Sequence, residues 1–469
     1  MDDFIREPSL FIGGEWVSAH GPELEVEDPA GQRVVGVVTQ ASASDVNEAI
    51  SAAKQAFPIW SGTSVAERVA FLRRLQLLLD ERAGLLADII NKEQGSPPAL
   101  ARKLHVDVPM AVLGGTIDAL SLYEFQSQIG NSIIFREPVG VIAAITPWNL
   151  PLHQIITKVI PAIAAGATVV LKPASLTPLV AYELARAIDE AGLIPGAFNL
   201  VPGSGSIVGE IMTHSPDVDL VSFTGSTAVG RQIAMASAAT IKRVTLELGG
   251  KSASVVLDDV SDQLLEKAVK VTVANCYLNA GQTCTALSRL IVPSSKIDQV
   301  EEIAAGAAAK YVPGDRLGPL ISAEQRKEVL SFLEPDSTGG AKALHFEQST
   351  LPERGYYLNP AVFSRVPADS RIAKEEIFGP VLSIFAVDSE TQAIELANDT
   401  IYGLSGAIWS DSQEHALSVS SQIRTGQIDI NGASFNPEAP FGGYKQSGIG
   451  REIGKYGIED ALELKAVQI

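Results

Sequence analysis

Residues 139–175 read VGVIAAITPWNLPLHQIITKVIPAIAAGATVVLKPAS. The stretch opens with a continuous apolar segment, Val139–Ile145, which predicts a strand buried on both faces. A helix is predicted after it, up to Ala165, and Gly166 is in position to end that helix. Thr168–Leu171 predicts a second buried strand. A strand, a helix and a strand in this order indicate a parallel sheet.

The same alternation continues downstream. A helix follows Pro178 and ends at Gly192, and further strands are predicted at Phe198–Val201, Leu220–Phe223 and Val244–Leu248, with a helix between the first two of these. Strands that are apolar on both faces and alternate with helices predict a doubly wound parallel sheet of the α/β class. Such sheets bind ligands beyond the carboxyl ends of their strands, so the residues after these strands are candidates for a binding site.

Two further units are predicted outside this sheet. A second α/β unit extends from about residue 249 to about residue 445, with strands at Ser254–Leu257 and Arg289–Val292 and a helix from Ser261 to Cys276. Two shorter pieces remain, Ser121–Glu137 and Leu462–Ile469. We expect both to be edge strands of a third, small β element.

Composition restricts the class of protein. Apolar residues make up 46% of the 469 residues and charged residues 19%, which supplies large buried cores and excludes a disordered chain. The formal net charge is −19, from 36 Lys and Arg against 55 Asp and Glu, so phosphate backbones and anionic lipid surfaces are repelled. We therefore expect neither a nucleic acid nor a membrane as a partner.

The termini and the cysteines suggest where the protein works. Met1–Pro8 is acidic and lacks the apolar core of a signal peptide, and the longest apolar stretch, Val159–Leu171, is interrupted by a proline and a glycine. The cysteines are Cys276 and Cys284, so neither a disulfide framework nor a zinc site with four Cys and His ligands is expected. These features predict a protein of the reducing cytoplasm with no metal site.

Seven short motifs follow one another along the chain. They are Thr146-Pro-Trp-Asn149, Leu171-Lys-Pro-Ala174, Phe223-Thr-Gly-Ser-Thr227, Glu247-Leu-Gly-Gly-Lys251, Gly281-Gln-Thr-Cys284, Glu375-Glu-Ile-Phe-Gly-Pro380 and Pro440-Phe-Gly-Gly-Tyr-Lys445. Each motif alone is weak, but seven in this order leave little room for chance. From about Leu10 to Val467 the sequence closely resembles the aldehyde dehydrogenase superfamily, of the hydrolytic, NAD(P)-dependent type.

The resemblance implies a division of the chain and a reaction. Residues 1–118 and 139–248 would form a cofactor-binding domain, residues 249–445 a catalytic domain, and residues 119–138 with 446–469 an oligomerisation element. The implied reaction oxidises an aldehyde to a carboxylic acid with NAD or NADP, through a thiohemiacetal and a thioester. The implied assembly is a homodimer or a homotetramer.

Three residues would carry the chemistry. Cys284 matches the nucleophile of the family, because a thiolate adds to a carbonyl carbon. Most free cysteines are instead small buried apolar residues, and Cys276 is interpreted in that way. Asn149, at the end of the first sheet strand, would donate to the oxyanion together with the backbone N–H of Cys284; an asparagine there is also a common turn residue.

A carboxylate is needed to hydrolyse the thioester. Glu247 matches the general base of the family and precedes two glycines that would give it room to move. Alone it would be interpreted as a surface glutamate. Lys158 and Glu452 match positions of a second proton-relay pair, although a plain salt bridge explains the pair almost as well.

The cofactor site departs from the usual G-x-G-x-x-G pattern. Gly203-x-Gly205 and Gly225-Ser226-Thr-x-x-Gly230 each follow a strand, and each could present backbone N–H groups to a pyrophosphate. The resemblance favours the second, although each glycine equally suits an ordinary turn or helix. The other residues that the resemblance places near the cofactor are Thr146, Pro147, Trp148, Lys172, Ser175, Glu247, Leu248, Gly249, Glu376 and Phe378.

Ser175 bears on the choice between NAD and NADP. NAD-selective relatives commonly carry a glutamate there, which repels the 2′-phosphate of NADP. A serine removes that repulsion, and Lys172 could add a positive charge, so good acceptance of NADP is expected. Ser175 could also cap the helix that begins near Pro178.

The resemblance also predicts a substrate tunnel. Its expected residues are Leu150, Gln154, Thr157, Thr283, Phe435 and Phe441. A relative that acts on small aldehydes carries a tryptophan where Thr157 stands, so a wider tunnel for medium-chain or aromatic aldehydes is expected here.

Other functions are disfavoured by the same residues. A CoA-acylating dehydrogenase generally lacks the glutamate found at Glu247, and an inactive relative would be expected to lose Glu247 or Cys284. A cysteine hydrolase needs a Cys–His pair, which the motif series does not supply.

Overall fold

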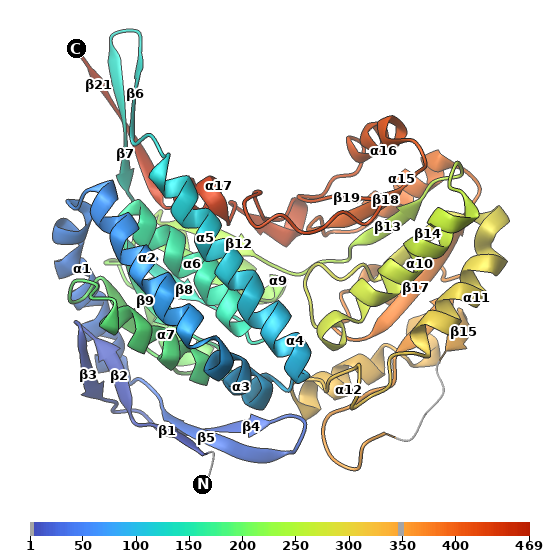
Figure 1. Ribbon diagram of the computed structural model, residues 1–469, viewed down its shortest axis with the longest axis horizontal. Coiled ribbons are helices and arrows are strands. Elements are labelled where there is room, and N and C mark those ends of the chain that lie inside the picture. Colours follow the sequence, from blue (N-terminus) through green and yellow to red (C-terminus); the bar gives the residue numbers. More distant parts are fainter. Residues whose placement is uncertain (1–3, 346–350) are drawn as a thin grey trace.

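The computed structural model describes residues 4–345 and 351–469. The first three residues of the predicted 1–118 segment and residues 346–350 of the predicted 249–445 segment lie outside the described residues. Two α/β lobes stand side by side, and a narrow β-sheet projects from the first of them (Figure 1). Among the described residues no helix combines the length and the apolar character needed to cross a membrane.

The first lobe contains an eight-stranded sheet in the order β20-β12-β11-β8-β9-β10-β2-β3. Its five central strands are parallel: β8 (Val141–Ile145), β9 (Thr168–Lys172), β10 (Phe198–Leu200), β11 (Leu220–Thr224) and β12 (Arg243–Glu247). The predicted doubly wound parallel sheet is therefore confirmed in its centre. The edge strands β2 (Ser9–Ile12), β3 (Glu15–Ser18) and β20 (Gly448–Ile449) pair antiparallel.

Helices cover both faces of this sheet. Alternate residues of β8 enter different apolar clusters, with Ile142 and Ala144 on one face and Val141 and Ala143 on the other. The first face is covered by α2 (Val65–Glu81), α3 (Ala83–Gln94), α5 (Val108–Ser121), α6 (Pro151–Ala165) and α7 (Leu179–Glu190). The second is covered by α1 (Ala43–Ser61), α8 (Glu210–His214) and α9 (Thr227–Ser237). Burial on both faces explains why the strands are continuously apolar.

The strand order places a switch point beside β8. The chain goes from β8 to β9 on one side, and later reaches β11 on the other side of β8. Connections that depart in opposite directions leave a crevice beyond the carboxyl ends of the two strands, where α/β proteins bind ligands. Thr146–Asn149 follows β8 and Gly225–Ser226 follows β11, so two of the seven motifs meet at this crevice.

The second lobe holds a seven-stranded sheet in the order β15-β16-β17-β14-β13-β18-β19. Its strands are β13 (Ala253–Val256), β14 (Arg289–Pro293), β15 (Lys342–His345), β16 (Ala361–Ser364), β17 (Val381–Val387), β18 (Gly406–Trp409) and β19 (Asp429–Ile430). Its longer helices are α10 (Asp262–Cys276), α11 (Ile297–Ala308), α12 (Ala323–Ser331), α15 (Glu390–Asn398) and α16 (Gln413–Ser420). The predicted second α/β unit is thus present.

The projecting sheet is the third predicted element. It joins β6 (Gln126–Ile129), β7 (Ser132–Pro138) and β21 (Leu462–Gln468) in the order β21-β7-β6 (Figure 1). Of the predicted 446–469 segment, only β21 enters this sheet. Strand β20 completes the first sheet, and α17 (Gly454–Asp460) packs against α5 and α6.

The remaining elements are short. The N-terminal strands β1 (Ile5–Glu7), β4 (Glu23–Asp28) and β5 (Arg33–Thr39) form a separate three-stranded sheet. The other short helices are α4 (Pro98–Arg102), the π-helices at Lys103–Asp107 and Gly205–Gly209, α13 (Pro335–Thr338), α14 (Arg371–Lys374), and the 3₁₀ turns at Leu278–Gly281, Ser294–Lys296 and Lys445–Ser447.

Candidate active site

A cavity of about 280 Å³ lies at the switch point of the first sheet, where the second lobe faces it. The sequence-predicted residues that line it are Pro147, Trp148, Asn149, Gln154, Gly225, Ser226, Leu248, Gly249, Cys284, Glu376 and Phe378. Five motifs from both lobes thus meet in one place. Four further residues line the cavity that were not predicted from the sequence: Thr224, Gln325, Glu328 and Ile377. Thr224 and Ile377 lie inside recognised motifs, whereas Gln325 and Glu328 belong to none of them.

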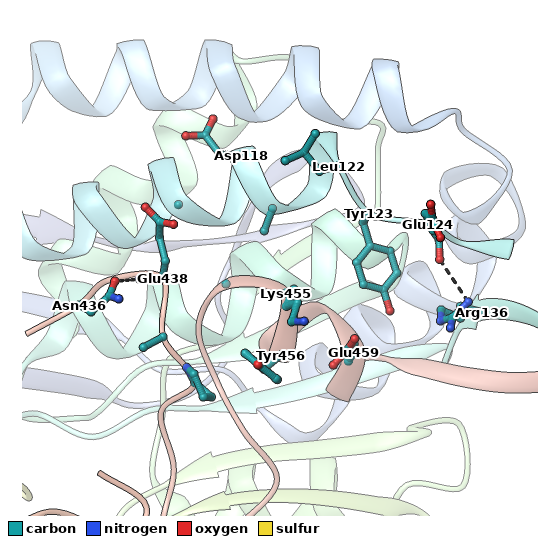
Figure 2. A pocket seen from close by; sticks show the side chains of 15 residues that line it. Asp118, Leu122, Tyr123, Glu124, Arg136, Asn436, Glu438, Lys455, Tyr456 and Glu459 are labelled. Atoms are coloured by element: carbon teal, nitrogen blue, oxygen red, sulfur yellow. Dashed lines mark hydrogen bonds between the residues drawn. The ribbon is translucent and has the colours of Figure 1, made fainter. Parts of the chain in front are cut away.

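A larger cavity, of about 760 Å³, lies elsewhere (Figure 2). Its side chains come from α5 and the residues just after it, β7, α17 and the loop before Phe441, and they include Tyr123, Arg136, Lys455 and Glu459. None of the predicted nucleophile, base or cofactor residues lines it. Size therefore does not identify the reaction site in this molecule; the chemistry of the lining does.

The turn that carries Cys284 has an unusual backbone. Asn279 and Ala280 have left-handed φ angles of 52° and 57°, and Gly281 follows with 76°. Few residues adopt such angles without support from their surroundings. The turn is closely packed, since a Cβ at Gly281 would lie 2.2 Å from the carbonyl carbon of Gly379 and a Cβ at Gly250 would lie 2.3 Å from the backbone oxygen of Cys284. The sharp turn presents Cys284 to the cavity.

Burial, with the nearby charges of Glu376 and Glu247, raises the pKa of the Cys284 thiol to about 12. The backbone N–H of the same residue acts in the opposite direction. The thiol is therefore protonated at neutral pH in the free protein. Cys276 differs in kind: it is fully buried in the apolar core and its S–H donates to the Val381 carbonyl at 3.4 Å, as predicted for a structural cysteine.

Asn149 is buried at the end of β8 and contacts the nucleophile turn. Its side-chain amide donates to the carbonyl of Gln282 at 3.1 Å, two residues before Cys284. In return, the Asn279 amide donates to the carbonyl of Asn149 at 2.8 Å. Gln94 from α3 donates to the Asn279 side chain at 2.9 Å, which orients that amide. Asn279 and Gln94 were not predicted, although Asn279 lies next to a recognised motif.

Glu247 ends β12 and is buried, with no hydrogen-bond partner for either carboxylate oxygen among the described residues. Its Oε1 lies against Gly442, where an added Cβ would approach it to 2.6 Å. Burial first, and then the charge of Glu452, raise the pKa of Glu247 well above its ordinary value, while Lys158 and Arg451 oppose this rise. In this conformation the carboxylate is turned toward the Lys158–Glu452 pair.

Lys158 on α6 and Glu452 form a buried ion pair. Glu452 is also fixed through its backbone, which exchanges two hydrogen bonds with Phe441, at 2.9 Å and 2.7 Å. Thr157 lines a second cavity together with Lys158 and Glu452, whereas Gln154 lines the cavity that contains Cys284. Gln154 and Thr157 therefore line different cavities, although they lie three residues apart on α6. Contact of Thr157 with the substrate stays a prediction.

The cavity offers groups suited to a nicotinamide dinucleotide. Ser226 is the N-cap of α9, so the first turn of that helix faces the cavity with its backbone N–H groups. The buried hydroxyl of Thr224 has no partner among the described residues. Trp148 and Phe378 meet edge to face at 5.5 Å.

Glu376 is the acidic group of this cavity. Its Oε1 accepts a hydrogen bond from the Gly250 N–H at 2.9 Å, and a Cβ at Gly249 would lie 2.2 Å from its Oε2. Burial raises the pKa of Glu376 to about 7. A carboxylate held this way can accept from ribose hydroxyls, so the residues present fit the cofactor that the motifs imply.

Lys172 ends β9, and Ser175 and Gly205 follow in the segments after β9 and β10; none of the three lines the cavity that contains Cys284. The Ser175 hydroxyl donates to the carbonyl of Gly203 at 3.0 Å, and Lys172 donates to the carbonyl of Pro173 at 2.9 Å. Burial lowers the pKa of Lys172 to about 8.

The alternative that Ser175 caps the next helix is wrong. Pro178 is the N-cap of α7, and no side chain of that residue caps the helix. Glu93 of α3 instead accepts the N–H groups of Leu179 and Val180, at 2.7 Å and 3.1 Å. A carboxylate at a helix N-terminus satisfies donors that the helix leaves unpaired. The Ser175 hydroxyl is engaged with Gly203 instead.

The other predicted residues are more scattered. Thr146 and Leu150 are buried and lie before and after Asn149 in the chain. The Thr283 hydroxyl donates to the carbonyl of Leu278 at 3.2 Å. Gly230 packs against the side chain of Leu248. Phe435 is 44% exposed, and Phe441 pairs with Glu452.

Comparison with known proteins gives one consistent result. Residues 16–467 match the model of the aldehyde dehydrogenase family. A 3-succinoylsemialdehyde-pyridine dehydrogenase from a Pseudomonas species is 45% identical, over 98% of each chain.

Solved structures agree. Aldehyde dehydrogenase C from Pseudomonas syringae, crystallised as a cysteine-to-alanine mutant with NAD+ and octanal, is 44% identical with a TM-score of 0.95, over 98% of this chain and 96% of that one. An aldehyde dehydrogenase from Mycobacterium tuberculosis in complex with NAD+ is 38% identical, also with a TM-score of 0.95, over 99% and 98%. The chain belongs to the aldehyde dehydrogenase family and oxidises aldehydes with a nicotinamide cofactor.

Proposed function

We propose that Cys284 is the nucleophile of this aldehyde oxidation. The single observation that carries the proposal is the 280 Å³ cavity, where Cys284, Asn149 and the cofactor-type groups converge. The thiol proton passes to solvent water, the sulfur bonds to the carbonyl carbon of the aldehyde, and the C=O π electron pair moves to the oxygen to form a thiohemiacetal oxyanion. Bound NAD(P)+ supplies a hydride acceptor and a positive charge that would lower the pKa of the thiol. Loss of hydride converts the thiohemiacetal to a thioester.

The oxyanion needs donors that are already in place. The side-chain amide of Asn149 and the backbone N–H of Cys284 are our candidates. The Asn149 amide is oriented by its 3.1 Å bond to the Gln282 carbonyl, and its second N–H remains for the substrate oxygen. Because these donors belong to buried backbone and side chains, little reorganisation is needed during the reaction.

Hydrolysis of the thioester completes the cycle, and Glu247 is the proposed base. It takes a proton from water, the water oxygen bonds to the acyl carbon, and the carbon–sulfur bond breaks to release the thiolate of Cys284. Its side chain then returns to the Gly442 side, where its carboxylate lies now, and gives the proton to the Lys158–Glu452 pair.

A panel of aldehydes with both cofactors tests the proposal. We expect medium-chain and aromatic aldehydes to exceed acetaldehyde in kcat/KM, by about tenfold or more if two or three further methylene groups are buried. The named substrates of two relatives support this, since one was crystallised with octanal and the other is named for a semialdehyde with a pyridine. Acetaldehyde with the highest kcat/KM of the panel contradicts the substrate class.

Ser175→Glu tests the choice of cofactor. We propose that NADP is accepted at least as well as NAD, because no carboxylate stands at Ser175 to repel the 2′-phosphate. The glutamate should reduce kcat/KM for NADP by about a hundredfold, because its carboxylate would repel the 2′-phosphate in a half-buried site. The kcat/KM for NAD should change much less. Ser175→Ala is the control, since it removes the bond to Gly203 without adding charge. If the wild type is strongly selective for NAD and Ser175→Glu leaves that selectivity unchanged, another residue determines the preference between NAD and NADP.

We propose that the protein is a homodimer or a homotetramer that works in the cytoplasm. The projecting sheet exposes Ile129, Leu464 and Ile469, at 69%, 72% and 72%, which is unfavourable for an isolated chain in water. Light scattering at micromolar concentration should give a mass at least twice that of the chain. A Leu464→Glu variant should dissociate into monomers more readily than a Glu463→Gln control. A monomeric mass for the wild-type protein would contradict the proposed assembly.

A further inference from the structure

A small polar cavity of about 30 Å³ lies beneath the first sheet, between α6 and α17. We call it the relay cavity. Its polar lining consists of Thr157, Lys158, Ser222, Thr245, Arg451, Glu452 and Asp460. A space of this size holds a water molecule when several polar groups surround it, as they do here.

The relay cavity begins directly beside Glu247. Thr245 and Glu247 are two residues apart on β12, so their side chains leave the same face of the sheet. Thr245 lines the cavity, and the charges of Lys158, Glu452 and Asp460 all act on Glu247. The proposed base and the cavity are therefore neighbours on one sheet face.

Asp460 lines the same space as Thr245 and Glu452. It is the last residue of α17 and is half-buried, whereas Glu452 is buried. Its Oδ2 accepts the N–H of Arg451 at 2.5 Å, and the positive charge of Arg243, itself partly exposed, acts on it. Burial raises the pKa of Asp460 above its ordinary value, which suits a group that takes up a proton transiently. Asp460 thus touches both the cavity and the solvent side.

We propose that Asp460 carries the proton of thioester hydrolysis from the relay cavity to solvent. The inference rests on the proposed role of Glu247. The proton abstracted from water moves from Glu247 to the Lys158–Glu452 pair, then through water in the cavity to the Asp460 carboxylate, and from there to bulk water. Every carrier returns to its starting protonation state once the proton has left. Asp460 touches neither substrate nor cofactor, so it is a proton-transfer residue rather than a catalytic one.

Asp460→Asn is the direct test. The amide oxygen can still accept from the Arg451 N–H, but the side chain no longer carries a proton at neutral pH. After rapid mixing with aldehyde and NAD+, intact mass spectrometry follows the decay of the acyl-enzyme on Cys284. In dilute buffer we expect that decay to slow by about tenfold, with the burst of reduced cofactor unchanged. Raising the concentration of a small buffer such as imidazole should restore the rate, as should Asp460→Glu.

Glu459→Gln is the matched control. Glu459 precedes Asp460 on α17 but faces the separate large cavity beside Lys455 and Tyr456 (Figure 2), so its replacement should leave the decay unchanged. An unchanged decay in Asp460→Asn, or a slower decay that buffer does not restore, overturns the inference. Absence of a burst and of an acyl-enzyme in the wild type would instead reject the proposed function itself.

Discussion

Cys284→Ala should abolish aldehyde oxidation. The thiol forms the only covalent bond between enzyme and substrate in the proposed cycle, so we expect kcat/KM to fall by at least about ten-thousandfold. The fold should remain, since Cys284 lies in a turn at the edge of a cavity rather than in an apolar core. Cofactor binding, measured by calorimetry, should persist. A variant that keeps most of its turnover contradicts the mechanism.

Cys276→Ala is the matched control for this prediction. Its thiol is fully buried and donates to the Val381 carbonyl, so the replacement should cost about 1 kcal/mol of stability and leave turnover close to that of the wild type. Alkylation provides a second readout. Because the pKa of the Cys284 thiol is raised to about 12, its reaction with iodoacetamide in the free protein should accelerate steadily as the pH increases from 7 to 10.

Glu247→Gln should separate the two halves of the reaction. Hydride transfer precedes the attack of water, so one equivalent of reduced cofactor should still form in a burst. Steady turnover should then fall by about a hundredfold to a thousandfold, because no base remains to activate water. Stopped-flow absorbance of the reduced cofactor measures both phases. Loss of the burst together with turnover would mean that Glu247 also acts before hydride transfer.

The pH profile of hydrolysis provides a further check on Glu247. A base works in its ionised form, and burial raises the pKa of Glu247. Hydrolysis by the wild type should therefore increase with pH through that raised pKa, at a pH well above the range of an ordinary glutamate. Glu247→Gln should lose this limb. Stability should change in the same window but with the opposite sign, because a raised carboxyl pKa favours the folded state only while the carboxyl is protonated, so folding weakens as the pH rises.

The order of strands and helices could be predicted because each element depends mainly on the hydrophobic pattern of its own residues. The continuously apolar segments before Thr146 and Lys172 are strands buried on both faces, and Gly166 ends the helix between them. Strand direction then follows, since helical crossovers join parallel strands. Parallel strands bring their carboxyl ends to one edge, which is why motifs distant in the chain were expected to share a site.

Side-chain direction could not be predicted in the same way. Gln154 and Thr157 are three residues apart on α6 and were expected in one pocket, yet Thr157 lines the relay cavity. Rotation along a helix is regular, but which side faces which cavity depends on the packing of α6 against the sheet and α17. The residue that caps the N-terminus of α7 could not be predicted either. It is Glu93 on α3, which lies 86 residues before Leu179 in the chain.

Local periodicity was enough to predict the α/β class and a ligand site beyond the carboxyl ends of the strands. Short motifs, through the family that they resemble, were enough to predict Cys284, Asn149 and Glu247 as candidates. Only the tertiary structure decided where the Glu247 carboxylate points, what supports Asn149, and that Asp460 shares a cavity with Glu452. These depend on contacts between segments far apart in the chain, where burial and charge act through space, and no pattern along the chain records such distances.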